Sequence, residues 1–303
     1  MIDYNKLSLP GKLIYINVVV YAITQLWCLC QVLFCISGFD WQNYLALHAN
    51  LYDFLSKPWT LFTYFFTHAD LSQDLFHIVF NMLWLWWFGD FFLRYHTGRQ
   101  FISVYLLGGI FSGLFFLLAY NIFPYFVFDR TFTSVVGASG AIFALIVAVA
   151  MRSPEETLYL NFIIRTVGVK MKWIAVAAIA INVLSLPSSY NIGGIVCHIG
   201  GALWGFIYGY YEAKGKNAAR WFEQLCDKFA NMLKPRPKMQ ASRGGARTVN
   251  ADKRKDMDYN ASQKARQAKI DAILDKISKS GYDGLTAEEK QMLFDASHRK
   301  NKS

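Results

Sequence analysis

The sequence predicts an all-α membrane protein: a six-helix transmembrane bundle followed by a small helical C-terminal tail. The chain is 54% hydrophobic and only 17% charged, which is too apolar for an ordinary soluble domain of this length. Its apolar residues gather in runs long enough to cross a bilayer as helices, and the polar connections between them are mostly short. The predicted spans are residues 13–38, 74–93, 100–122, 137–152, 172–187 and 193–212.

Basic residues predict which side of the membrane each connection faces. Lys6 and Lys12 lie in residues 1–12, and the connections after the second and fourth spans are also basic. The connections on the other side carry only Lys57 and Arg130. By the positive-inside rule, residues 1–12 form a cytoplasmic N-terminus, and with six spans the C-terminus is cytoplasmic too. The expected location is the bacterial inner membrane.

The connection between the first two spans, residues 39–73, is too long for a tight turn. It is rich in Trp, Tyr and Phe. Aromatic rings concentrate at membrane–water interfaces, so we expect an ordered structure lying in the outer interface rather than a free linker.

The tail after the sixth span divides into three parts. Residues 213–233 have apolar positions at helical spacing, which predicts an interfacial amphipathic helix. Residues 234–262 are basic and contain Pro235, Pro237 and the Gly244-Gly245 pair, which predicts a flexible linker. Residues 263–303 predict a small helical hairpin, with Gly281 ending its first helix and a capping box from Thr286 to Glu289 opening the second.

Charge and cysteine content narrow the classes of partner. Residues 213–303 carry 21 Lys and Arg and 11 Asp and Glu, so the tail accounts for the net charge of +10. A basic tail beside a membrane favours contact with anionic lipid headgroups over nucleic acid, and no nucleic-acid binding is expected. The five cysteines have no metal-ligand spacing, so they are expected to be small apolar residues rather than a metal site.

Four polar side chains stand out because alternating spans bring them to one depth. The second, fourth and sixth spans enter from the same face, and near these ends they carry His77 and Asn81, Ser139, and His198, respectively. Each has a structural interpretation alone: a serine bonds the preceding turn, an asparagine joins helices, and a histidine lies at headgroup level. Ionisable groups inside a membrane are costly and often functional, so their coincidence favours a site.

The chemistry of this set is that of acyl transfer. A serine beside a histidine is a nucleophile with its general base. The Asn81 amide, the His77 ring N–H and the backbone N–H of Ser139 are candidate donors to a developing oxyanion. No carboxylate lies at that depth, so we expect a Ser–His dyad, with Phe143 stacking on the His198 ring. Small residues support close packing of the fourth and sixth spans, namely Gly140, Ala141, Ala144, Ala148, Gly201, Gly205 and Gly209.

At these residues the sequence resembles the rhomboid intramembrane serine proteases over about residues 50–212. The resemblance is carried by three motifs in order, His77-x-x-x-Asn81, Gly137-x-Ser139-Gly140 and His198-x-x-Gly201-x-x-x-Gly205. It implies a rhomboid-like bundle in which Ser139 is the nucleophile, His198 the base, and His77 and Asn81 the oxyanion stabilisers. The family cleaves transmembrane protein substrates near the membrane surface without metal or ATP, so no cofactor is implied.

The sequence departs from the family pattern in three places. An aspartate, Asp90, follows the Phe88-Gly89 pair where members often have glutamate nearby; the stretch from His68 to His77 is longer than usual; and Phe143 replaces a tyrosine found in some members. The main alternative is a catalytically inactive relative that binds transmembrane clients as an adaptor, and a transporter is a third possibility. Substrate identity, oligomeric state and the role of the tail stay open.

Overall fold

The computed structural model describes residues 4–36, 39–69, 71–127, 133–159, 168–188 and 191–233, and parts of 261–292. The chain forms two compact units, Met1–Lys234 and Pro235–Ser303, which are described separately below. The predicted linker, residues 234–262, lies almost entirely outside the described residues.

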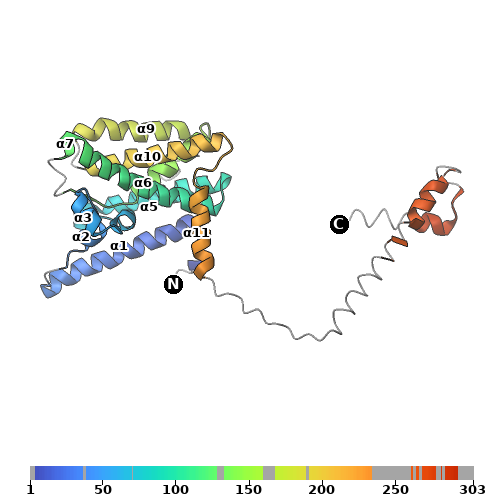
Figure 1. Ribbon diagram of the computed structural model, residues 1–303, viewed down its shortest axis with the longest axis horizontal. Helices are drawn as coiled ribbons and strands as arrows, with labels where there is room; N and C mark the ends of the chain where they lie inside the picture. Colours follow the sequence, from blue (N-terminus) through green and yellow to red (C-terminus); the bar gives the residue numbers. More distant parts are fainter. Residues whose placement is uncertain are drawn as a thin grey trace. The chain divides into compact units, whose positions relative to one another are not determined.

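Each of the six apolar runs forms a helix (Figure 1). Among the described residues, four helices are long and apolar enough to cross a membrane, and two apolar helices are shorter. The short ones, α8 and α9, have 14 and 15 residues. The protein is therefore a mostly helical membrane protein, and six spans remain a proposal. The helices are α1 (Leu9–Phe34), α5 (Leu71–Tyr95), α6 (Gly98–Ile122), α8 (Ser139–Arg152), α9 (Met171–Ser185) and α10 (Ile192–Ala213).

Some helices begin at residues other than the predicted ones, because capping interactions determine where their first turns form. Helix α1 begins before residue 13 because the Ser8 side chain accepts from the Gly11 amide and Pro10 suits the first turn. Helix α6 begins at Gly98 because Thr97 and Gln100 form a capping box. The prediction that the fourth span begins at Gly137 was wrong by two residues, because Gly137 has φ +126° and cannot join the helix.

The core of the first unit is formed mainly by α6, α8 and α10. Nearly every residue of α8 is buried, from Gly140 to Ala150 with the exception of Phe143. Helices α1 and α9 lie at the periphery and have many exposed apolar side chains, among them Leu26, Val32, Ile181 and Leu184. Such surfaces are stable in lipid rather than water, which agrees with a membrane protein.

The aromatic connection after α1 is ordered, as predicted. It contains α2 (Trp41–Leu45), β1 (Leu47–His48), α3 (Leu51–Ser56), α4 (Thr60–Thr63) and the 3₁₀ turn η2 (Tyr64–Phe66). Strand β1 pairs antiparallel with β2 (Ser134–Val135), which lies between α7 (Pro124–Val127) and α8. This pairing fixes the segment that leads into α8.

The C-terminal end of α5 contacts the segment that follows α8. Arg94 contacts Glu156 at 3.2 Å, and the Tyr95 hydroxyl donates to the same carboxylate at 2.7 Å. His96 lies 2.8 Å from Glu212 of α10, which also contacts Arg152 at 3.3 Å.

A short hairpin joins α8 to α9. Strands β3 (Thr157–Tyr159) and β4 (Gly168–Lys170) pair antiparallel. Beside them Glu155 accepts from Lys170 and Lys172, and these hydrogen bonds lower the pKa of Glu155 to about 2.

The helix after α10 begins later than predicted and runs across the direction of the bundle helices (Figure 1). It is α11 (Arg220–Leu233), and the Asn217 side chain accepts from the Ala219 amide just before it. Arg99 of α6 contacts Asp227 at 2.9 Å, and Ala219 is fully buried. The exposed apolar residues of α11 include Trp221, Leu225, Phe229 and Met232. An interfacial position for α11 stays a prediction.

In the second unit the described residues form short helices over 268–277 and 287–292. The predicted capping box is present, because the Thr286 amide donates to Glu289 at 2.8 Å and the Glu289 amide donates to the Thr286 hydroxyl. Gly281 has φ +72° and donates to the Ile277 carbonyl, as expected for a helix-ending glycine. Lys276 joins the two helices through Glu289 at 3.0 Å.

Candidate active site

Ser139 is the first residue of α8, and the segment before it is held from outside. The Gly137 amide donates to the Tyr64 carbonyl at 2.9 Å, and the β1–β2 pairing holds Val135 against Leu47. Gly137 then turns with φ +126° into Ala138, the N-cap of α8. Ala138 makes no side-chain capping hydrogen bond to this helix end. The first backbone N–H groups of α8 have no intrahelical acceptor because they lie in its first turn.

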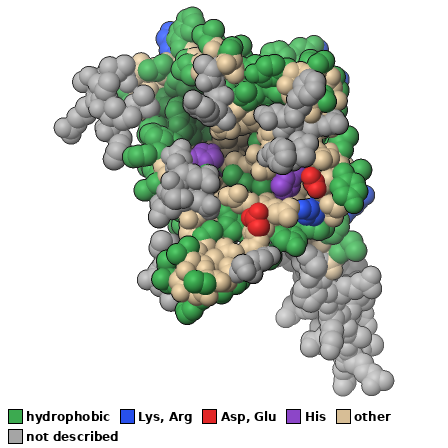
Figure 2. Space-filling model, turned by 90° about the vertical axis from the view of Figure 1, so that its left-hand side faces the viewer, with side chains coloured by type: hydrophobic (Ala, Val, Ile, Leu, Met, Phe, Trp, Pro, Cys, Tyr) green, Lys and Arg blue, Asp and Glu red, His purple; other side chains and the backbone are tan. Residues whose placement is uncertain are grey.

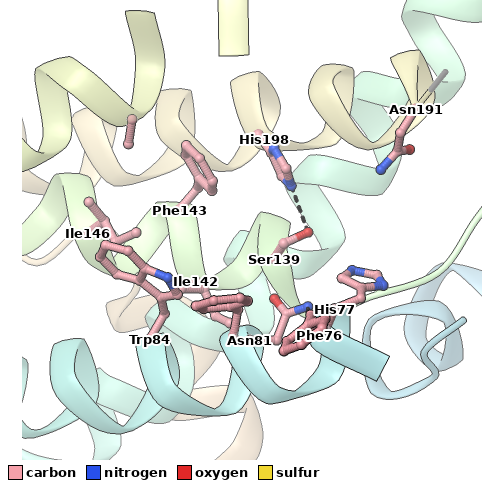
Figure 3. Close-up of a pocket in the computed structure, with 12 residues that line it drawn as sticks. Phe76, His77, Asn81, Trp84, Ser139, Ile142, Phe143, Ile146, Asn191 and His198 are labelled. Atoms are coloured by element: carbon pink, nitrogen blue, oxygen red, sulfur yellow. Dashed lines mark hydrogen bonds between the residues drawn. The ribbon is translucent and has the colours of Figure 1, made fainter. Parts of the chain in front are cut away.

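His198 on α10 faces Ser139 directly. Its Nε2 lies 2.7 Å from Ser139 Oγ (Figure 3). The Phe143 ring, one turn further along α8, stacks on the imidazole at a centroid distance of 4.4 Å and an interplanar angle of 6°. The expected contact between the two residues and the expected ring stacking are both present.

The contact between Ser139 and His198 depends on very close approach of α8 and α10. A Cβ on Gly201 would overlap the Gly140 carbonyl oxygen, and one on Gly205 would overlap the Ala144 carbonyl oxygen. A Cβ on Gly140 would meet the Ser112 side chain of α6, whose hydroxyl donates to the Cys197 carbonyl at 2.8 Å. Only glycine at these positions allows the helix backbones to touch.

His77 and Asn81 of α5 lie on the opposite side of Ser139 from His198 (Figure 3). The His77 ring packs on Gly137, where a Cβ would lie 3.0 Å from Nε2. One Asn81 N–H donates to the His77 carbonyl at 2.8 Å, which orients the amide. The second N–H of the same amide group is not needed for that bond. The four predicted polar groups thus meet in one place.

These side chains line a cavity of about 480 Å³. Its other walls are largely apolar and include Phe76, Phe80, Trp84, Ile142 and Ile146. Figure 2 shows histidine side chains on the face at the α2 and α3 end of the bundle, which is hollowed among hydrophobic groups. A polar set at one side of an apolar cavity is the usual arrangement of a binding site.

Three further polar residues belong to this region. Asn182 Oδ1 of α9 lies 2.6 Å from His198 Nδ1. Asn191 lines the cavity. The buried His68 ring contacts the His77 ring edge-on, with 5.6 Å between the ring centroids. Asn182 was visible in the sequence as a rare polar residue within a span, but nothing there indicated its partner. Within the described ranges, no group of three or more His, Cys, Asp or Glu residues is arranged to hold a metal ion.

Comparison with protein families gives two matches. The Rhomboid domain family matches residues 55–215, slightly more than half of the chain. A second family, described as a family of unknown function (DUF6576), matches residues 253–299 in the second unit.

Several curated proteins are similar to the chain. Rhomboid protein 1, mitochondrial, of Saccharomyces cerevisiae is 26% identical over 227 residues, covering 70% of this chain and 59% of that protein. RHOMBOID-like protein 12, mitochondrial, of Arabidopsis thaliana is 33% identical over 153 residues, covering 47% and 43%. The mouse presenilin-associated rhomboid-like protein, mitochondrial, is 31% identical over 140 residues, covering 45% and 34%.

The matched part of each relative is between about a third and three fifths of its own length. All three relatives are named mitochondrial proteins, so the bacterial inner membrane stays a prediction for this chain. The family match spans the helices that carry Ser139, His198, His77 and Asn81, and with it the chain belongs to the rhomboid family.

Proposed function

We propose that this protein is an intramembrane serine endopeptidase that cleaves transmembrane protein substrates. The observation that carries the proposal is the 2.7 Å contact between Ser139 Oγ and His198 Nε2, at the wall of a cavity in a membrane-embedded bundle. A nucleophile within hydrogen-bond reach of its base is the first geometric requirement for this chemistry.

In the proposed reaction Ser139 Oγ attacks the carbonyl carbon of the scissile peptide bond. His198 Nε2 accepts the hydroxyl proton and then donates it to the nitrogen of the departing amine, so that the C–N bond breaks and an acyl-enzyme forms. A water molecule, deprotonated by His198, then attacks the ester carbonyl carbon. The C–Oγ bond breaks, the His198 imidazolium returns its proton to Ser139 Oγ, and the new carboxyl end is released. Phe143 supports this cycle because its ring holds the imidazole plane in place.

The negative charge of the tetrahedral intermediate is proposed to lie between α5 and the start of α8. The Ser139 backbone N–H belongs to the first turn of α8 and lies at the positive end of that helix. The second Asn81 N–H and the His77 ring, which packs on Gly137, complete the donor set. Preorganised donors of this kind are worth the most in a site that excludes bulk water.

Helix length supports a site below the membrane surface. Helix α8 has 14 residues, which span about 21 Å, whereas the hydrocarbon layer is about 30 Å thick. We propose that α8 and α9 complete a six-span bundle with cytoplasmic termini. Helix α8 would then start below the outer face, which puts Ser139 within reach of a bond near the outer end of a substrate helix.

The apolar walls of the cavity favour substrates that are themselves membrane segments. Membrane lipids and transmembrane proteins are the proposed partners, and nucleic acid is not among them.

The test is cleavage of a short transmembrane substrate by the purified full-length protein reconstituted in liposomes. Wild-type protein is expected to cleave it, and Ser139→Ala and His198→Ala are each expected to abolish cleavage while remaining folded. The alternative function, an inactive adaptor, predicts that wild-type and Ser139→Ala proteins bind the substrate equally and that neither cleaves it.

A further inference from the structure

We infer that Asn182 is a positioning residue that orients His198, the general base of the Ser139–His198 pair. This inference deepens the proposed function and rests on it. Asn182 lies on α9, a peripheral helix, and its Oδ1 is 2.6 Å from Nδ1 of His198. Ser139 occupies the other ring nitrogen of the same imidazole at 2.7 Å.

The orientation of the Asn182 amide is fixed by its second contact. Asn182 Nδ2 lies 2.8 Å from the Ala178 carbonyl oxygen, one turn earlier on α9. A carbonyl only accepts, so the atom facing it must be the NH₂ group. The oxygen of the amide therefore faces His198.

This orientation selects one tautomer of His198. An amide oxygen can only accept, so Nδ1 of the imidazole must carry a hydrogen and donate it to Asn182. The neutral ring then has its lone pair on Nε2, the atom that faces Ser139 Oγ. Nε2 is thereby in the form that accepts the Ser139 proton. The opposite tautomer would place a hydrogen on Nε2 and leave Nδ1 facing the Asn182 oxygen with no hydrogen between them.

Asn182 and Phe143 hold the ring in different ways. Phe143 stacks parallel to the imidazole at 4.4 Å and restricts its tilt. Asn182 fixes rotation within the ring plane through a directional hydrogen bond. Together they restrain His198 while Ser139 is attacking, and pre-oriented groups of this kind lower the barrier.

A neutral amide suits this location better than the carboxylate of many serine proteases. The neighbouring side chains Ile181 and Leu184 are 64% and 78% exposed, as expected where α9 faces lipid. An ionised carboxylate at such a position carries a desolvation cost that is offset only while the imidazole is charged, whereas an amide that makes two hydrogen bonds carries no such cost. The amide dipole still stabilises the imidazolium that forms when Nε2 takes the proton.

The test compares three variants of the full chain in the liposome cleavage assay. Asn182→Leu keeps a similar volume and removes the acceptor; we expect kcat to fall about 10- to 100-fold with KM little changed, the effect of losing one hydrogen bond to a reacting group. Ile181→Ala is the matched control on the same helix, and we expect wild-type kinetics from it. Among the described residues that line this cavity, the titratable histidines are His198 and His77.

Asn182→Asp supplies a readout that a structural role would not affect. A carboxylate accepts the same Nδ1 hydrogen, so activity is restored above that of Asn182→Leu. It also stabilises the imidazolium, so the acid limb of the pH profile of kcat/KM moves to higher pH by about one to three units. A merely structural role predicts that kcat in Asn182→Leu and Asn182→Asp changes only as their stability does, with no separate recovery of kcat in Asn182→Asp.

The results that overturn the inference are separate from those that overturn the proposed function. Wild-type kcat in folded Asn182→Leu overturns the inference alone, provided that Ser139→Ala is inactive. If Asn182→Leu does not fold, an acid limb in Asn182→Asp that coincides with the wild-type limb overturns it equally. Cleavage by Ser139→Ala at the wild-type rate overturns the proposed function and the inference together.

Discussion

Gly201 of α10 packs directly on the carbonyl group of Gly140, the residue that follows Ser139 on α8. A Cβ on Gly201 would lie 2.8 Å from the Gly140 carbonyl carbon and 2.9 Å from Ser112 Oγ. Because backbone rather than a flexible side chain blocks this space, any larger residue must push the two helices apart. The same movement would separate His198 from Ser139.

Gly201→Ala is therefore expected to reduce stability and activity together. Overpacking of this kind costs about 1–3 kcal/mol. We expect a lower midpoint of thermal unfolding in detergent and a fall in kcat, measured on the same preparation. Leu203→Ala is the control, since Leu203 is on the same helix but 41% exposed. A Gly201→Val protein with wild-type stability and kcat would contradict the packing seen here.

Removal of an oxyanion donor is expected to affect chemistry more than binding. Asn81→Ala and His77→Ala should each lower kcat by about 10²–10³, the usual loss for one such donor, with the protein still folded. Val79→Ala on the exposed side of α5 should cleave like the wild type. Wild-type kcat in both site variants would mean that the charge of the intermediate is stabilised elsewhere.

His68 is expected to make stability depend on pH. Its side chain is fully buried, and burial, with a smaller contribution from His77, lowers the pKa of His68 to about 3. An unfolded histidine takes up a proton near pH 6.5, whereas folded His68 stays neutral. Lowering the pH from about 6.5 toward 3 therefore favours the unfolded state.

The corresponding variant is His68→Phe, which cannot take up that proton. Thermal unfolding in detergent between pH 7.5 and 4.5 should show a smaller loss of the midpoint temperature for this variant than for the wild type. Equal pH dependence in the two proteins would contradict this account, because it would mean that His68 takes up its proton as readily in the folded state as in the unfolded state.

Much of the fold could be predicted because its signals are local. The six apolar runs, the capping box at Thr286 and the helix end at Gly281 each depend on a few neighbouring residues. The coincidence of Ser139 and His198 was predictable because both lie near the same ends of alternating spans.

What could not be predicted depends on contacts between distant segments. The pairing of Leu47 with Val135 involves strands of two residues, too short for an alternating pattern. The contact of Asn182 with His198 depends on how α9 is rotated against α10, which hydrophobicity alone does not specify. The start of α8 at Ser139 depends on the dihedral angle of Gly137.

Removal of the second unit should leave the chemistry intact. The candidate site lies wholly within the first unit, and a chain ending at Leu233 keeps every helix of that unit. We expect this shortened protein to cleave a detergent-solubilised substrate at close to the full-length rate. A folded but inactive shortened protein would show that the tail is coupled to the site.

The identity of the nucleophile can be measured most directly by covalent labelling. A fluorophosphonate reacts with a serine only where a base activates its hydroxyl, and mass spectrometry of the labelled protein identifies the modified residue. We predict a single adduct on Ser139 in the wild type, no adduct in Ser139→Ala, and strongly slowed labelling in His198→Ala. A protein that cleaves its substrate while the adduct forms on another residue, or that labels equally fast without His198, would contradict the assignment of Ser139 and His198 as nucleophile and base.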